Sequence, residues 1–145
     1  YGMNDGIYHP ASAERTKAFQ EGINQLVDAC KQKGARLLLI TPPAFDAKSA
    51  NGIVPKDADL FGYKTPYEDY SDVMAEYGQW LLNRDDILAI DVHSSMTAWL
   101  EKEHAGDPDF SSGDGVHPNE AGVGKIVEVL GPRLLELVAA ARNDE

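Results

Sequence analysis

The chain has 145 residues, of which 43% are hydrophobic and 26% are charged, a length sufficient for one domain with a core and too short for two ordinary domains. The formal net charge of −11 at pH 7 argues against nucleic acid or an anionic membrane surface as the main partner, because both attract positive proteins. The single cysteine, Cys30, excludes an internal disulfide, and no apolar run is long enough for a membrane span.

The first part of the chain reads as a loop, a helix and a strand. Residues 1–10 are rich in Gly, Asn, Asp and Pro, as loops are. A helix is expected over residues 12–33, with Ser12 as N-cap and Gly34 as its stop. One face of this helix is apolar and carries Phe19, Ile23, Leu26, Val27 and Cys30. Residues 36–40 are apolar without alternation, which is typical of a parallel strand buried on both faces.

The remaining elements alternate in the same way. Residues 44–66 show no periodicity but hold several aromatic side chains, so we expect a packed flap over part of the molecule. A helix is predicted over 67–84, a buried strand over 87–92 and a further helix from residue 94 or 95. Residues 105–118 read as a loop. A last helix is expected over 119–141, kinked or divided at Gly131-Pro132.

Helices that alternate with buried strands predict an α/β fold with a parallel sheet. Two strands alone cannot form such a sheet, because each needs neighbours and cover on both faces. We therefore expect further strands ahead of residue 1, and we expect residues 1–145 to be the C-terminal part of a single domain.

Two loops carry residues suited to acyl-transfer chemistry. Asp114 and His117 are three positions apart, so the carboxylate could orient the imidazole and leave one ring nitrogen free as a general base. The alternative is a helix-capping Asp beside a surface His. In the first loop, the amide of Asn4 could donate to an oxyanion, whereas the alternative is ordinary turn chemistry.

Taken together, Gly2-Met3-Asn4-Asp5 and Asp114-Gly115-Val116-His117-Pro118 resemble the SGNH hydrolases, the GDSL-type lipases and esterases. The resemblance implies a three-layer α/β/α flavodoxin-like parallel sheet, of which only the C-terminal part is present. It implies that His117 is the general base, Asp114 its orienting acid and Asn4 an oxyanion-hole donor, with Gly2 shaping the loop. It also implies that no metal and no cofactor takes part.

The chain departs from that family in lacking the Gly-Asp-Ser block that carries the nucleophile. Ser111 and Ser112 are near Asp114 in sequence but lie outside such a block, so the nucleophile is expected on the protein's own N-terminal segment or on a complementary chain. The expected substrate is a small ester, such as an acetyl ester on carbohydrate, with Phe45, Phe61 and Tyr63 as contacts. A non-catalytic binding module and one half of a two-chain hydrolase are the alternatives; a secreted or periplasmic location stays open.

Other titratable residues receive structural interpretations. Asp91 and His93 are interpreted as strand-end and helix-cap residues. His9 is interpreted as a surface residue, with a place in the wall of the substrate pocket as the alternative. His104 lies near a helix end, where its charge suits the helix dipole. No group of His, Cys and Asp residues has the spacing of a metal site.

Overall fold

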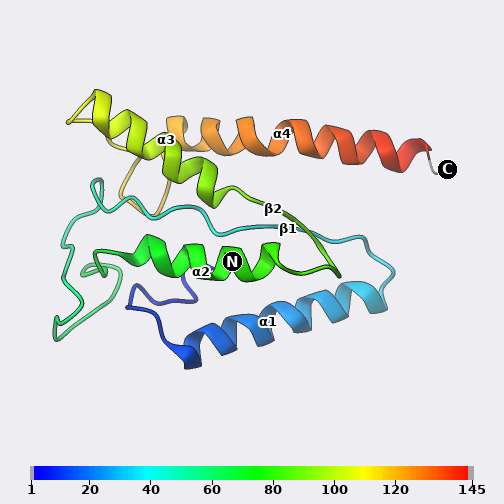
Figure 1. Cartoon of the computed structure of the whole chain (residues 1–145), viewed down its shortest axis with the longest axis horizontal. Coiled ribbons are helices and arrows are strands. Elements are labelled where there is room, and N and C mark those ends of the chain that lie inside the picture. Colours follow the sequence, from blue (N-terminus) through cyan, green and yellow to red (C-terminus); the bar gives the residue numbers. More distant parts are fainter. Residues whose placement is uncertain (1, 144–145) are drawn as a thin grey trace.

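Helices and short strands alternate along the computed structural model of this protein, which describes residues 2–143 (Figure 1). The elements in this range are α1 (Ala13–Gln32), β1 (Leu38–Ile40), α2 (Tyr70–Leu82), β2 (Leu88–Ile90), α3 (His93–Gly106) and α4 (Glu120–Asn143). Each element lies where the sequence predicts one, and the mixed α/β class is confirmed.

The two strands form a parallel pair in which Leu38 is opposite Leu88 and Ile40 is opposite Ile90. Figure 1 shows this pair between α1 and α2 on one side and α3 and α4 on the other. The predicted burial of both strand faces is wrong within the described residues, because Ile40 is 44% exposed and the rest of β1 is only partly buried. In a two-stranded sheet each strand has one edge without a partner strand, so the side chains along that edge stay accessible despite the helices on both sides.

The apolar stripe of α1 packs as its spacing predicts. Phe19, Ile23 and Val27 are buried, and the ring of Phe19 stacks on Tyr77 of α2 with centroids 4.3 Å apart. Gly34 follows the helix with φ +65°, the left-handed conformation expected of a helix stop. Ser12 occupies the N-cap position without a side-chain capping hydrogen bond.

Helix α2 begins later than predicted because two backbone amides just ahead of it bind other loops. The amide of Tyr67 donates to the carbonyl of Tyr8, and the amide of Glu68 donates to the carbonyl of Val54. These bonds tie the flap to the first loop, so that part of the expected helix belongs to the flap.

Helix α3 begins at His93, earlier than predicted, because side chains satisfy its first amides. The Thr41 hydroxyl accepts from the backbone amides of Val92 and His93, both at 2.9 Å, and an Asp91 carboxylate oxygen accepts from the amide of Ser94 at 3.0 Å. Asp91 therefore has the predicted capping role. Thr41 follows β1, so these bonds also connect the ends of both strands.

Helix α4 is continuous through Pro132, so of the two outcomes expected at Gly131-Pro132, a kink or a division, the division is wrong. A proline removes one helical hydrogen bond, and Pro132 is exposed, so water can satisfy the carbonyl that loses its donor.

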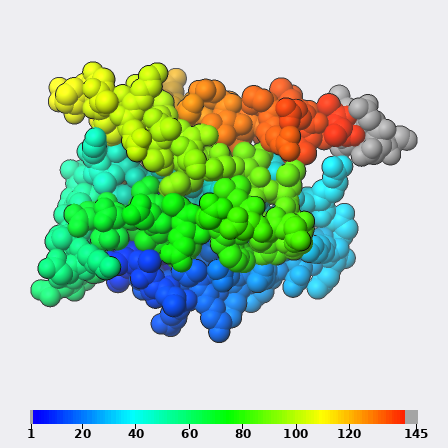
Figure 2. Space-filling view, viewed as in Figure 1, coloured from blue at the N-terminus to red at the C-terminus, as the bar shows by residue number. Residues whose placement is uncertain are grey.

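Apolar side chains of α4 stay exposed, among them Val127, Leu134, Leu135 and Val138. Figure 2 shows α4 running along one edge of the molecule. A hollow of about 260 Å³ lies between this helix and the strands, and Leu37, Leu88 and Leu137 are among its lining residues. Of the exposed large hydrophobic residues in the described part of the chain, more than half lie on α4.

Candidate functional site

The loop ahead of α4 brings the predicted acid and base together. His117 Nδ1 lies 2.9 Å from Asp114 Oδ2, while Asp114 Oδ1 accepts from the backbone amides of Val116 at 2.9 Å and His117 at 2.6 Å. The carboxylate therefore fixes both the turn and the ring. A carboxylate on Nδ1 favours the tautomer in which Nε2 carries a lone pair, and the His117 side chain is 74% exposed.

Hydrogen bonds keep Asp114 ionised. The His117 side chain, followed by the His117 backbone amide, holds the pKa of the Asp114 carboxyl well below its usual range. The hydroxyl of Tyr63 donates to the same carboxylate at 2.7 Å. Asp114 is consequently a fixed negative charge beside the imidazole at every pH at which a histidine ordinarily titrates.

Glycine is required at two positions of this loop. Gly113 has φ +135°, and a Cβ there would overlap the carbonyl oxygen of His117. Gly115 has φ +86°, and a Cβ there would lie 2.6 Å from Ala50 Cβ. At Gly113 the backbone of the loop therefore packs against the loop itself. At Gly115 it packs against the turn formed by residues 46–50.

The first loop presents an amide donor. Gly2 has φ +103°, a Cβ on it would overlap Pro42, and its backbone amide donates to Asp5 Oδ2 at 2.7 Å. Asn4 is exposed, and its Oδ1 accepts from the hydroxyl of Tyr8 at 2.6 Å. Because Oδ1 is engaged in this way, the Asn4 amide is oriented and its Nδ2 remains available as a donor, with no protein acceptor among residues 2–143.

Two tyrosines link the first loop to the acid–base pair. The Tyr8 ring, whose hydroxyl binds Asn4, lies edge-on to the Tyr63 ring with centroids 5.7 Å apart. The Tyr63 ring lies 6.0 Å from the imidazole of His117. Sequence reasoning proposed Tyr63 as a substrate contact and missed Tyr8, whose direction depends on an unusual left-handed φ of 62°.

The flap contributes a hollow beside the acid–base pair. This hollow has a volume of about 210 Å³, and Phe45, Tyr63 and Asp114 are among its lining residues. Phe45 is otherwise buried in the core, where its ring meets Tyr70. Phe61 does not line this hollow, and its ring lies 5.2 Å from His9. Of the predicted aromatic contacts, Phe45 and Tyr63 are therefore adjacent to the pair.

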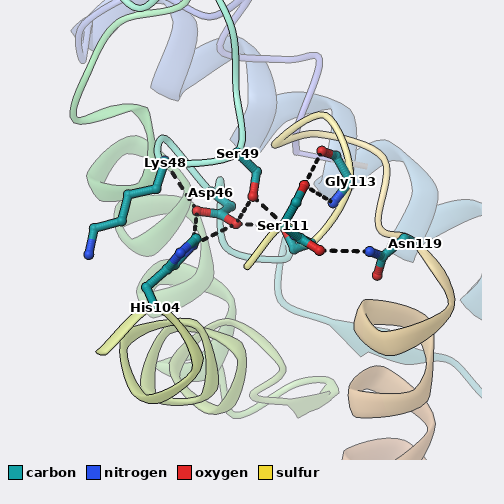
Figure 3. Close-up of polar contacts among 8 residues, drawn as sticks. Asp46, Lys48, Ser49, His104, Ser111, Gly113 and Asn119 are labelled. Carbon is teal, nitrogen blue, oxygen red and sulfur yellow. Dashed lines mark hydrogen bonds and ion pairs between the residues drawn. The ribbon is translucent and has the colours of Figure 1, made fainter. Parts of the chain in front are cut away.

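A buried polar cluster lies next to the same loop, and sequence reasoning missed it. His104 Nε2 lies 2.9 Å and 3.0 Å from the two carboxylate oxygens of Asp46, and both side chains are 5% exposed. Figure 3 shows Asp46 and Ser49 on the segment after β1 facing His104 on helix α3. His104 lies in the last turn of α3, near a helix end as predicted, but its imidazole is buried against the Asp46 carboxylate, a contact that the prediction did not include.

Hydroxyl groups complete the cluster. Ser49 Oγ and Ser112 Oγ each donate to Asp46 Oδ2 at 2.6 Å. Burial, the largest single influence, raises the pKa of Asp46, but the hydrogen bonds from Ser112, Ser49 and His104 outweigh it and lower the pKa overall. Asp46 is thus a buried carboxylate that its partners keep charged.

No hydroxyl of the described residues is hydrogen-bonded to His117. The Ser112 hydroxyl binds Asp46, and the Ser111 hydroxyl donates to the carbonyl of Gly113 at 2.8 Å. Neither of the two serines nearest in sequence is therefore positioned as a nucleophile for His117.

The described residues contain no group of three potential metal ligands, and none of their helices has the length and apolarity needed to cross a membrane. His93 is buried, and its Nδ1 has no partner within residues 2–143.

No protein-family model, curated protein or solved structure matches this chain.

Proposed function

We propose that this chain carries the base and the oxyanion donor of an SGNH-type serine ester hydrolase, as the C-terminal part of a three-layer flavodoxin-like domain. The observation that supports this most is the pairing of His117 Nδ1 with an ionised Asp114, on an imidazole that is largely exposed and whose Nε2 is not used in that pairing. The tyrosine link adds an oriented amide donor, Asn4, that is connected to the pair through Tyr8 and Tyr63.

In the proposed reaction, a serine hydroxyl from a segment outside residues 1–145 attacks the acyl carbon of an ester. His117 Nε2 takes the hydroxyl proton, and the Asn4 amide donates to the oxyanion of the tetrahedral intermediate. The protonated His117 then gives its proton to the leaving alcohol. Water hydrolyses the acyl-enzyme by the same steps, while Asp114 stays ionised and holds the imidazole.

The proposed substrate is a small acyl ester, with an acetyl ester on carbohydrate as the leading example. The hollow of about 210 Å³ beside Asp114 has room for a small group, and its walls combine apolar Phe45 and Val116 with polar Asn51 and Lys64. Small apolar and polar surfaces of this kind suit an acetyl group and a sugar hydroxyl respectively.

We propose that the serine-bearing polypeptide extends the sheet beside β1, either as an N-terminal segment of the same protein or as a complementary chain. Partly buried strands and exposed apolar residues on α4 support this, because such surfaces are normally covered. The free edge of a parallel strand offers backbone groups for one more strand.

Labelling with a serine-directed fluorophosphonate tests the function. We expect the full-length natural protein to be labelled and to hydrolyse p-nitrophenyl acetate, and His117→Gln to abolish both. The matched control is His9→Gln, which removes a nearby imidazole that does not contact Asp114 and should keep most of the activity.

The outcomes separate the alternatives. Labelling confined to a second polypeptide would establish the two-chain hydrolase. No labelling and no ester hydrolysis by the full-length protein would refute the hydrolase and leave a binding module. Unchanged activity in His117→Gln would remove His117 as the base.

A further inference from the structure

A buried carboxylate ties the loop that carries the acid–base pair to the segment after β1. Asp46 accepts from the hydroxyls of Ser112 and Ser49, and the backbone amide of Asp46 donates to the carbonyl of Gly115 at 3.0 Å. Ser49 Oγ in turn accepts from the backbone amide of Ser112 at 3.0 Å. The two segments are therefore joined at both Ser112 and Gly115, on either side of Asp114.

These bonds fix the position of the loop in the molecule, which the contacts within the loop do not. The contacts of Asp114 with Val116 and His117 set the shape of the turn, but they are local and do not fix where the turn lies. Ser112 fixes that position, because its carbonyl also accepts from the amide of Asn119 at 2.7 Å, immediately before α4. Figure 3 shows that the Asn119 side-chain amide also donates to the carbonyl of the adjacent residue, Ser111. Asp46 thus holds the residue at which the loop and the last helix meet.

Other donors hold Asp46 in turn. His104 Nε2 contacts both carboxylate oxygens, and the backbone amide of Lys48 donates to Oδ1 at 3.2 Å. Each carboxylate oxygen therefore has partners in more than one direction, and a side chain held in this way cannot rotate without breaking several bonds in a buried site.

We propose that Asp46 is a positioning residue for the Asp114–His117 pair, acting through Ser49 and Ser112; this rests on the proposed function. Asp46 is not a catalytic residue, because it is buried and contacts neither member of the pair through its side chain. Asp46 fixes where the turn that carries Asp114 and His117 lies relative to the segment after β1. It thereby fixes the direction in which His117 Nε2 points.

Neighbouring serines supply a matched test. Ser112→Ala removes a hydroxyl bound to Asp46, whereas Ser111→Ala removes an exposed hydroxyl whose bonds stay within its own loop and can be replaced by water. In the full-length natural protein we expect Ser112→Ala to lower kcat for p-nitrophenyl acetate about 10- to 100-fold with little change in KM. Ser111→Ala should stay within about threefold of wild type. Ser49→Ala should behave like Ser112→Ala, and Ser49→Thr, which keeps the hydroxyl, should restore activity.

A second readout does not depend on activity. The ¹⁵N chemical shifts of His117, assigned with His117→Gln, report which ring nitrogen carries the proton. We expect the Nδ1–H tautomer in wild type and a shift toward Nε2–H in Ser112→Ala, at unchanged circular dichroism. A merely structural role for Asp46 would change stability but not the tautomer of the folded protein.

The two readouts distinguish the failures. If wild type neither hydrolyses esters nor is labelled, the proposed function fails, while the tautomer comparison still tests positioning. If wild type is active, and Ser112→Ala keeps both its kcat and the wild-type tautomer, the positioning role of Asp46 is refuted.

Discussion

Replacing Gly115 by alanine tests the contact between the loop that carries Asp114 and His117 and the turn formed by residues 46–50. The backbone of Gly115 has φ +86°, and a Cβ there would lie 2.6 Å from Ala50 Cβ and 2.7 Å from the carbonyl oxygen of Asp46. A left-handed conformation costs a non-glycine residue about 1–2 kcal/mol, and forcing extra carbon into a packed contact costs about 1–3 kcal/mol. Gly115→Ala should therefore lower the free energy of unfolding by about 2–5 kcal/mol.

Urea unfolding of the full-length protein measures this change. The control is Gly124→Ala, at a helical position with open space around it, which should raise the unfolding free energy by up to about 1 kcal/mol. Adding Ala50→Gly to Gly115→Ala removes the nearest carbon–carbon overlap. This double variant should recover part of the loss, but not the part that comes from the φ angle or from the Asp46 carbonyl.

A Gly115→Ala protein within about 0.5 kcal/mol of wild type would contradict the reasoning, since substitutions remote from special features stay within that range. Complete recovery in the double variant would show that the loop relieves its backbone strain when the carbon–carbon contact alone is removed.

Three further predictions concern the pKa values of Asp114 and Asp46 and the exposed apolar surface of α4. Tyr63→Phe removes a hydroxyl that lowers the pKa of Asp114, so ¹³C NMR should find that pKa raised; an unchanged value would mean that the hydrogen bond is absent in solution. The pKa of Asp46 is lowered in the folded protein, so its contribution to stability is present above the unfolded pKa of about 3.9 and is lost as pH falls through the folded pKa. Asp46→Asn should therefore flatten the loss of unfolding free energy below about pH 4, and an equally steep loss would count against this assignment. If a further polypeptide covers α4, then Leu135→Arg should destabilise the full-length protein. The control is Leu60→Arg in the flap, which should not destabilise it, although Leu60 is 69% exposed and Leu135 is 72% exposed. Equal effects of the two substitutions would argue against a polypeptide that covers α4.

Sequence periodicity was sufficient for the parts of the fold that depend on local pattern. Helix α1 follows from the spacing of Phe19, Ile23 and Val27, and the pairing of Asp114 with His117 follows from a separation of three residues. The ends of helices were less predictable, because they depend on distant partners. Thr41 starts α3 early from across the sheet, and no local signal at His93 reveals that contact.

The Asp46 cluster shows most clearly that contacts between residues far apart in the sequence could not be predicted from local pattern. Asp46 and His104 are 58 positions apart, and each has the sequence context of an ordinary surface residue. Only the packing of α3 beside the segment after β1 makes them a buried pair. Tyr8 was missed for a different reason: its ring reaches Asn4 because Ile7 and Tyr8 both have positive φ, and neither residue type predicts that conformation.

The long-range anchoring of the loop has a consequence for the order of folding. Asp46 and Ser112 are 66 positions apart, and Tyr63 and Asp114 are 51 apart. Contacts of such separation form slowly, since the intervening chain must be ordered first. During synthesis, α1 and α2 can pack while the partner of Asp46 is still unmade. The Asp114–His117 pair should thus be among the last features to acquire its place, so that a chain stalled before α4 would be largely folded without an ordered pair.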